Sequence, residues 1–162
     1  MATVLYPTRG GDTTYRNQDW ACDLALERGA DLLLLYVSNV HFLDHASGPV
    51  QLDVLEKELD ELGQFLLAMA EERAQKSGAK ANRLVLQGEF RQALKEVVQG
   101  YDITAVVLGR PSHDTAVTTF EYIDSLARSI TTEYRVESFV IDQGEVVEHY
   151  SPAPNEDHDQ AD

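Results

Sequence analysis

The chain has few basic residues and almost no cysteine. Lys and Arg number 13 against 28 Asp and Glu, which gives a formal net charge of −15 at pH 7. Because such a charge repels phosphates, we expect no general binding to nucleic acid or to an anionic membrane. The lone Cys22 excludes an intramolecular disulfide and a multi-cysteine metal site, and its apolar neighbours predict a buried side chain.

Long hydrophobic runs are also missing. The longest, around 32–37, is far too short to cross a bilayer, and no basic segment followed by an apolar stretch opens the chain. We therefore expect a cytoplasmic protein. Its 162 residues, 43% of them hydrophobic, suit one folded domain.

Short apolar segments alternate with segments of helical periodicity. The segments that predict strands are Thr3–Pro7, Asp31–Val37, Asn82–Gln87, Ile103–Gly109 and Val136–Ile141. This order indicates an α/β domain over residues 1–142, with a five-stranded parallel open sheet and helices on both faces. The last strand alternates most strongly between apolar and polar residues, which is typical of an edge strand.

The longest predicted helix follows a loop at 38–50. Apolar residues recur in it at steps of three and four: Leu52, Leu55, Leu59, Leu62, Leu66 and Met69. Such a heptad pattern can form a coiled coil, but inside an α/β chain we interpret it as the stripe that covers the sheet.

The last residues, 143–162, predict a flexible acidic tail. Seven acidic residues and no Lys or Arg lie between Asp142 and Asp162, and no apolar periodicity is evident at the very end of the chain. The segment Val146–Tyr150 could still pack locally or against a partner.

Ligands of open parallel sheets bind at the carboxyl ends of strands where the chain order reverses, so the loops after the first and fourth strands matter most. They contain no G-x-x-x-x-G-K-[ST] motif and no G-x-S-x-G elbow. Ser112 and His113 are adjacent, which does not make a nucleophile and base pair. We interpret the loop with His41, Asp44 and His45 as solvated surface, and expect neither catalytic residues nor a metal site.

The segments "TVLYPTRGG", "GADLLLLYV", "LQGEFRQALKEVVQGYDITAVVLGR" and "DSLARSI" make residues 2–141 resemble the universal stress protein family. The resemblance implies an adenine nucleotide alpha hydrolase-like fold with strand order 3-2-1-4-5. It also implies a homodimer in which the fifth strand, Val136 to Ile141, pairs with its copy.

Members of that family that bind ATP carry P-x-D-G-S after the first strand, and G-x-x-G followed by G-[ST] after the fourth. Here Arg9 takes the acidic place, Gly11 the serine place, and Ser112 that of the second glycine. With a two-residue insertion, Ser125 keeps the hydroxyl of the last motif. The resemblance thus implies these candidate ligand-binding residues: Arg9, Gly10, Gly11, Val37, Gly88, Gly109, Arg110, Ser112 and Ser125.

Because the motifs are degenerate, we predict a non-catalytic stress-response module with no firm cofactor and without tight ATP binding. The alternative is a regulatory module that binds a nucleotide or another anion between Arg9 and Arg110. Against this stands pairing of both arginines with Asp12, Asp114 or Asp124. A slow ATPase is the third hypothesis, supported only by analogy of fold.

Overall fold

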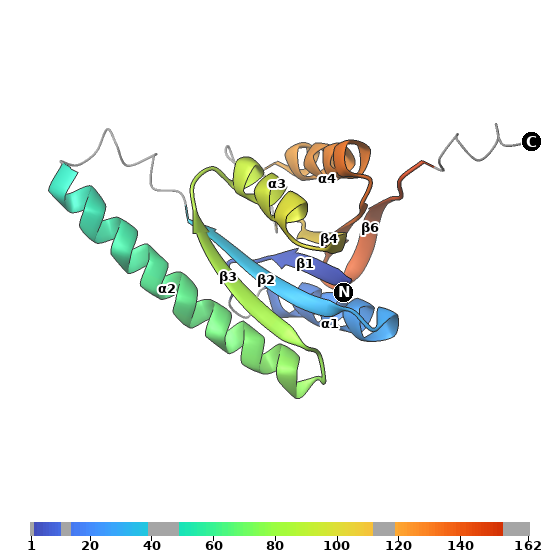
Figure 1. Ribbon diagram of the computed structural model, residues 1–162, viewed down its shortest axis with the longest axis horizontal. Helices are drawn as coiled ribbons and strands as arrows, with labels where there is room; N and C mark the ends of the chain where they lie inside the picture. The colour runs from blue at the N-terminus through green and yellow to red at the C-terminus, as the bar shows by residue number, and fades with distance from the viewer. Residues whose placement is uncertain (1, 11–13, 39–48, 112–118, 154–162) are drawn as a thin grey trace, which may run out of the picture.

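The computed structural model describes residues 2–10, 14–38, 49–111 and 119–153. The side chains of residues 49–53 lie outside this description. Six strands form one sheet in the order β3-β2-β1-β4-β5-β6 (Figure 1). The first five are parallel and β6 is antiparallel to β5. The strands are β1 (Thr3–Pro7), β2 (Asp31–Ser38), β3 (Ala81–Gln87), β4 (Ile103–Gly109), β5 (Glu137–Asp142) and β6 (Glu145–Tyr150).

Two helices cover each face of the sheet. Their bounds are α1 (Tyr15–Arg28), α2 (Pro49–Lys76), α3 (Phe90–Gly100) and α4 (Phe120–Tyr134). Within β2, Leu32 and Leu34 belong to the apolar core under α1 and α2, whereas Leu33 and Leu35 belong to the core under α3 and α4. This alternation is the two-residue period of a strand buried on both sides, and it confirms the predicted parallel α/β fold and strand order.

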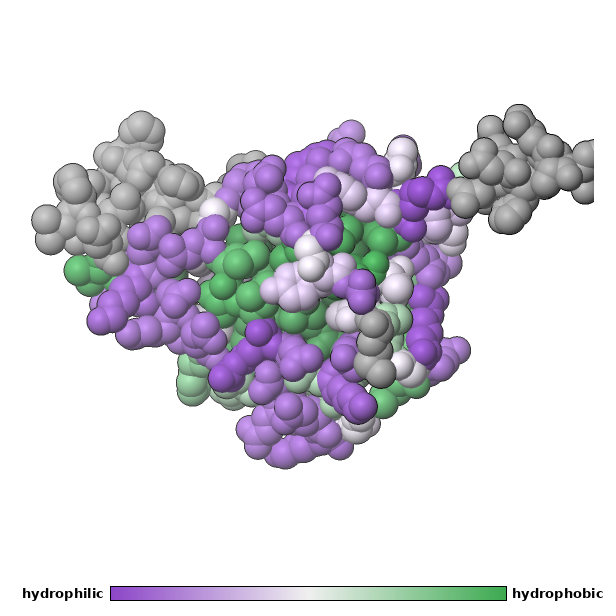
Figure 2. All heavy atoms as spheres, in the orientation of Figure 1, coloured by the Kyte–Doolittle hydropathy of each residue, from purple (hydrophilic) through white to green (hydrophobic). Residues whose placement is uncertain are grey.

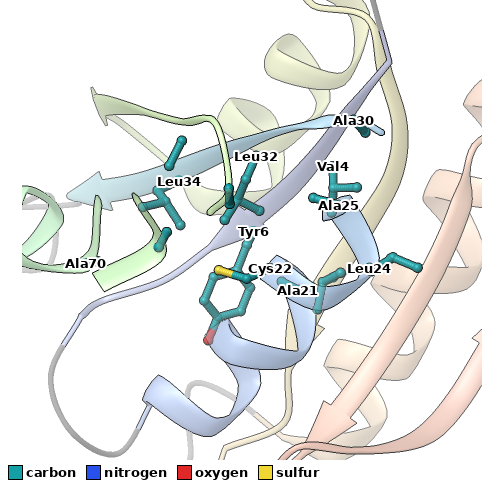
Figure 3. Close-up of a cluster of buried hydrophobic side chains, with 14 of the residues drawn as sticks. Val4, Tyr6, Ala21, Cys22, Leu24, Ala25, Ala30, Leu32, Leu34 and Ala70 are labelled. Atoms are coloured by element: carbon teal, nitrogen blue, oxygen red, sulfur yellow. The ribbon is translucent and has the colours of Figure 1, made fainter. Parts of the chain in front are cut away.

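The core beneath α1 surrounds Cys22, as Figure 3 shows. Its side chain is 1% exposed and lies among Tyr6, Ala21 and Leu32. Burial, and to a smaller extent the nearby Asp19 carboxylate, raise the pKa of the thiol to about 11. The predicted buried cysteine is confirmed.

The predicted sheet-facing stripe of α2 is wrong at Leu62 and Met69, which are exposed, whereas Leu66 packs against the core under α1 and α2. Among the residues of this helix whose side chains the structure describes, the buried ones are Gly63, Leu67, Ala70 and Ala74, and Leu52 lies outside them. The physical reason is close packing, because a Cβ added at Gly63 would lie 2.6 Å from Cδ1 of the Tyr36 ring. Gly63, Ala70 and Ala74 therefore face the sheet together with Leu67, whereas Leu62 and Met69 turn to the outer side of the helix.

The predicted edge strand is also wrong, since β5 pairs with β4 on one side and with β6 on the other. Gln143 and Gly144 connect β5 and β6 with φ of 50° and 83°. Two consecutive residues with positive φ form the type I′ turn whose twist matches a two-residue hairpin. The segment predicted as a tail from residue 143 is therefore sheet up to Tyr150, and residues 154–162 lie outside the described part.

The other end of the sheet is β3, which has a neighbour on one side only. Its residues Leu84, Val85 and Leu86 are half-buried. Figure 2 shows apolar side chains gathered between α2 and α3, over β2 and β3, on a surface that is otherwise mostly hydrophilic. Among the described helices, none is long and apolar enough to span a membrane.

Candidate functional site

A cleft of about 730 Å³ opens at the carboxyl ends of the parallel strands. It lies between β1 and β4, where the strand order reverses, which is the place at which open α/β sheets bind ligands. Its lining comprises Tyr6, Pro7, Thr8, Arg9, Gly10, Thr14, Arg16, Asn17, Leu35, Val37, Phe90, Leu108, Gly109, Arg110, Pro111, Tyr122, Ile123, Asp142 and Gln143.

The loop after β1 forms one rim of the cleft. The Thr8 N–H donates to the carbonyl of Leu35 at 2.8 Å, and the Thr8 hydroxyl accepts from the N–H of Gly10 at 2.9 Å. Gly10 has φ of +74° and lies against α2, where an added Cβ would come 2.8 Å from Cβ of Leu66. Any side chain at this position would strain the backbone and collide with Leu66, so only glycine lets the loop pack directly on α2. Arg9 is then exposed at the rim, and it forms no ion pair with any described residue.

Arg110 forms the opposite rim after β4. Its backbone N–H donates to the carbonyl of Ile141 at 2.8 Å, and its guanidinium donates to Asp124 at 3.1 Å. The same guanidinium lies 5.0 Å from the centre of the Phe120 ring, while its Nε is buried and has no hydrogen-bond partner among the described residues. The predicted pairing of a loop arginine with Asp124 is therefore confirmed for Arg110, whereas Asp12 and Asp114 lie outside the described residues.

Aromatic and aliphatic side chains from β2, β4, α3 and α4 form a wall of the cleft. Phe90 and Tyr122 supply two rings, and Val37 and Leu108 lie with them in the lining. Burial raises the pKa of the Tyr122 hydroxyl, as does nearby Glu89, so the ring remains neutral at physiological pH. Neutral rings and aliphatic groups suit a flat, apolar part of a ligand.

Asn17 holds the inner side of the cleft together. It is 7% exposed, and its Oδ1 accepts from the N–H of Gly144 in the β5–β6 turn at 2.8 Å. A Cβ added at Gly109 would lie 3.1 Å from Asn17 Nδ2, so the glycine at the end of β4 leaves room for this side chain. The contact brings Asp142 and Gln143 into the lining.

The cleft has a cationic lining, although the protein is strongly acidic. Among the described lining residues, Arg9, Arg16 and Arg110 are cationic and Asp142 is the one carboxylate. Helix α1 begins at this lining with no acidic residue in its first turn and without a side-chain cap from Thr14. Its first N–H groups and its dipole therefore add positive potential on the same side as Arg16.

The structure brings together five of the nine predicted site residues: Arg9, Gly10, Val37, Gly109 and Arg110 all line the cleft. Gly11 and Ser112 lie outside the described residues. Gly88 and Ser125 are not in the described lining, and their part in a ligand site stays a prediction.

Ser125 lies outside the lining because of where α4 begins. The helix starts at Phe120, and the hydroxyl at its N-terminus is that of Thr119, which accepts from the N–H of Tyr122 at 3.0 Å. Ser125 lies more than a turn further along and is exposed. Gly88 makes the turn into α3, whose first turn is capped instead by the side chain of Glu89.

Sequence reasoning missed Thr8, Asn17, Phe90, Tyr122 and the hairpin residues Asp142 and Gln143. Phe90 is the first residue of α3 and Tyr122 lies in the first turn of α4, and the starts of helices that follow strands could have been inspected. Asn17 could not be found in this way, because its partner Gly144 belongs to a segment that was interpreted as tail.

The comparisons with known proteins agree with this architecture. The model of the universal stress protein family matches residues 1–119. No curated protein matches the chain significantly in sequence.

Several solved structures share the fold. A universal stress protein family member from Burkholderia pseudomallei is 19% identical with a TM-score of 0.65, covering 86% of this chain and 94% of its own. A universal stress protein in complex with cAMP is 21% identical with a TM-score of 0.62, covering 86% and 96%. The protein from Archaeoglobus fulgidus in complex with dAMP is 18% identical with a TM-score of 0.53, covering 88% and 96%. On the family match over 1–119, the chain belongs to the universal stress protein family.

Proposed function

We propose that this chain is a non-catalytic regulatory module that binds a nucleoside monophosphate in the cleft between β1 and β4. The observation that carries the proposal is the division of the lining into a neutral aromatic wall and a set of three arginines. A planar base suits the wall that includes Phe90 and Tyr122, and one phosphate suits Arg9, Arg16 and the first turn of α1.

Two solved relatives of the same fold support this ligand class, because they are complexes with cAMP and dAMP. Both ligands carry a single phosphate. In this chain Asp142 stands in the lining and Asp124 pairs with Arg110, so one arginine is already neutralised and one carboxylate would repel added phosphates. Both effects favour one phosphate over three, and we expect ATP to bind more weakly than AMP.

The absence of catalysis is part of the proposal. The described lining holds a single carboxylate and neither histidine nor cysteine, so these residues supply no pair of nucleophile and base. Phosphate release from ATP at the rate of a buffer blank is the expected result. Release above the blank that is lost in Arg9→Ala would instead support the slow ATPase.

Binding is tested by calorimetry with AMP, cAMP, ATP with and without Mg²⁺, adenosine and inorganic phosphate. We expect AMP or cAMP to bind more tightly than either adenosine or phosphate alone, since only the whole ligand reaches both parts of the lining. Arg9→Ala should weaken AMP binding about 10-fold, the effect of one exposed charge-assisted contact. Arg83→Ala removes an exposed arginine on β3 that is not in the lining of the cleft, and serves as the control. No binding by any of these ligands would contradict the proposal.

Assembly through the fifth strand stays a prediction. In this chain β6 occupies the side of β5 that such a dimer would use. A copy could pair there only if β6 moved away, or it could pair with the free side of β6 instead.

A further inference from the structure

Helix α2 carries more apolar surface than the sheet uses. Its sheet-facing side is the buried row of Gly63, Leu67, Ala70 and Ala74, with Leu66 packed beside it. A second stripe faces away from the sheet, where Leu62, Phe65 and Met69 are 46%, 61% and 45% exposed. These three residues are spaced i, i+3 and i+7, so they lie on one side of the helix.

The outward stripe belongs to a regular heptad pattern. Leucines at 55 and 62 and the methionine at 69 repeat every seven residues, and Leu59 and Leu66 form the neighbouring row. Both Leu59 and Leu66 are half-buried, between the sheet side and the outward side of the helix. A repeat of seven is what a helix needs to pack along another helix over several turns, and the sheet beneath α2 does not require it.

We propose that this stripe is a docking surface for α2 of a second copy of the chain, packed antiparallel about a twofold axis near Phe65. The partner is argued from the pattern itself, since a heptad stripe is complementary to another of the same kind. In the antiparallel register Leu62 lies opposite Met69 of the second copy, and the two Phe65 rings meet near the axis. Each copy thereby covers the other's three exposed side chains.

The charges along α2 determine the orientation. Residues 54–62 contain four acidic residues and one lysine, whereas residues 68–76 contain two acidic residues balanced by Arg73 and Lys76. A parallel pair would place the acidic halves against each other. The antiparallel register that sets Leu62 opposite Met69 also brings Glu58 towards the end of α2 that carries the 75% exposed Lys76, while Arg73 stays paired with Asp19 of α1 at 2.8 Å.

Sedimentation velocity over a range of protein concentration tests the association with the full chain. We expect a dimer that Phe65→Glu weakens at least ~100-fold, because two carboxylates then meet at the axis where two rings were buried. Leu26→Glu is the matched control, since Leu26 is a similarly exposed leucine on α1, away from the stripe. Equal thermal unfolding of the two variants at a concentration where both are monomeric shows that Phe65→Glu leaves the fold intact.

Cross-linking with a short bismaleimide tests the orientation. Chains with Leu62→Cys mixed with chains with Met69→Cys should form a cross-linked dimer, while either variant alone should not. The buried Cys22 does not interfere under native conditions.

Three results would overturn the proposal. The first is a chain that is monomeric at every concentration tested. The second is a dimer that survives Phe65→Glu, which would point to the β5–β6 edge instead. The third is efficient cross-linking of Leu62→Cys alone, as a parallel pair requires.

Discussion

Asn17 and Gly144 are 127 positions apart, yet the Asn17 side chain accepts a hydrogen bond of 2.8 Å from the Gly144 N–H. The contact joins the first turns of α1 to the turn between β5 and β6. It also places Asp142 and Gln143 against the lining that β1 and β4 provide. The turn between β5 and β6, with the Asp142 carboxylate, is therefore part of the candidate site.

Removing the Asn17 side chain should destabilise the fold and loosen the cleft. In Asn17→Ala the half-buried Gly144 N–H loses its acceptor, which costs about 1 kcal/mol or more of unfolding free energy. Urea unfolding measures the loss. Asn82→Ala, at an exposed asparagine of β3, is the control and should change stability by less than about 0.5 kcal/mol. Equal stability of the two variants would show that the hairpin is not held by this contact.

A second group of contacts attaches β6 to the domain from the outer side. Nη1 and Nη2 of the Arg28 guanidinium donate to the Glu137 carboxylate, at 2.8 and 3.2 Å. Nε2 of the His149 ring lies 2.6 Å from the same carboxylate. The His149 ring also stacks on Phe139 at 4.3 Å between centres. The hydrogen bonds from Arg28, with that to His149, lower the pKa of Glu137 below its ordinary value.

This lowered pKa makes part of the stability pH-dependent. Because the carboxylate is favoured in the folded state, its contribution is present above the unfolded pKa and is lost as pH falls through the folded pKa. We expect Glu137→Gln to cost about 1–2 kcal/mol at pH 7, with the difference from wild type shrinking below about pH 4. Urea unfolding at a series of pH values measures both curves, and a difference that is constant across pH would contradict the role of the charge.

Much of the fold was predictable because its signals are local. Buried strands such as Ile103–Gly109 are continuous apolar runs, and their alternation with helices specifies a parallel sheet. Within the site, Arg9 and Arg110 were predicted because they lie in the loops that follow the first and fourth strands. The inner part of the cleft could not be found in this way, because it depends on a contact between Asn17 and a turn whose strand is short and charged.

The side of α2 that faces the sheet could not be predicted from the sequence pattern alone. Its leucines are the most regular apolar feature of the sequence. The side of the helix that faces the sheet is nevertheless the one on which the backbone can approach the strands closely. Gly63 illustrates the reason, since its neighbour is the face of the Tyr36 ring. A pattern identifies a helix, but two competing apolar stripes require packing geometry to be told apart.

Gly63→Ala tests that closeness. The new Cβ would lie 2.6 Å from Cδ1 and 2.8 Å from Cε1 of Tyr36, whose ring is only 9% exposed and cannot swing freely into solvent. Overpacking costs about 1–3 kcal/mol, which exceeds the gain of about 1 kcal/mol from replacing glycine inside a helix. We expect a net loss of stability in thermal or urea unfolding. Gly100→Ala, at the end of α3 with no atom within 4 Å of the added Cβ, should be neutral or stabilising, and an equal response of both positions would contradict the close packing of α2.

Cys22 offers a direct measure of how firmly α1 is held. Its thiol is 1% exposed with a pKa raised to about 11, so at pH 8 both access and thiolate are scarce in the folded chain. Iodoacetamide should therefore label the native protein at least ~100-fold more slowly than the urea-unfolded protein. Because labelling requires α1 to open, Asn17→Ala should accelerate it, while the control Asn82→Ala should not. Rapid labelling of the native wild-type chain would mean that α1 separates from the core far more readily than its packing around Tyr6 and Leu32 indicates.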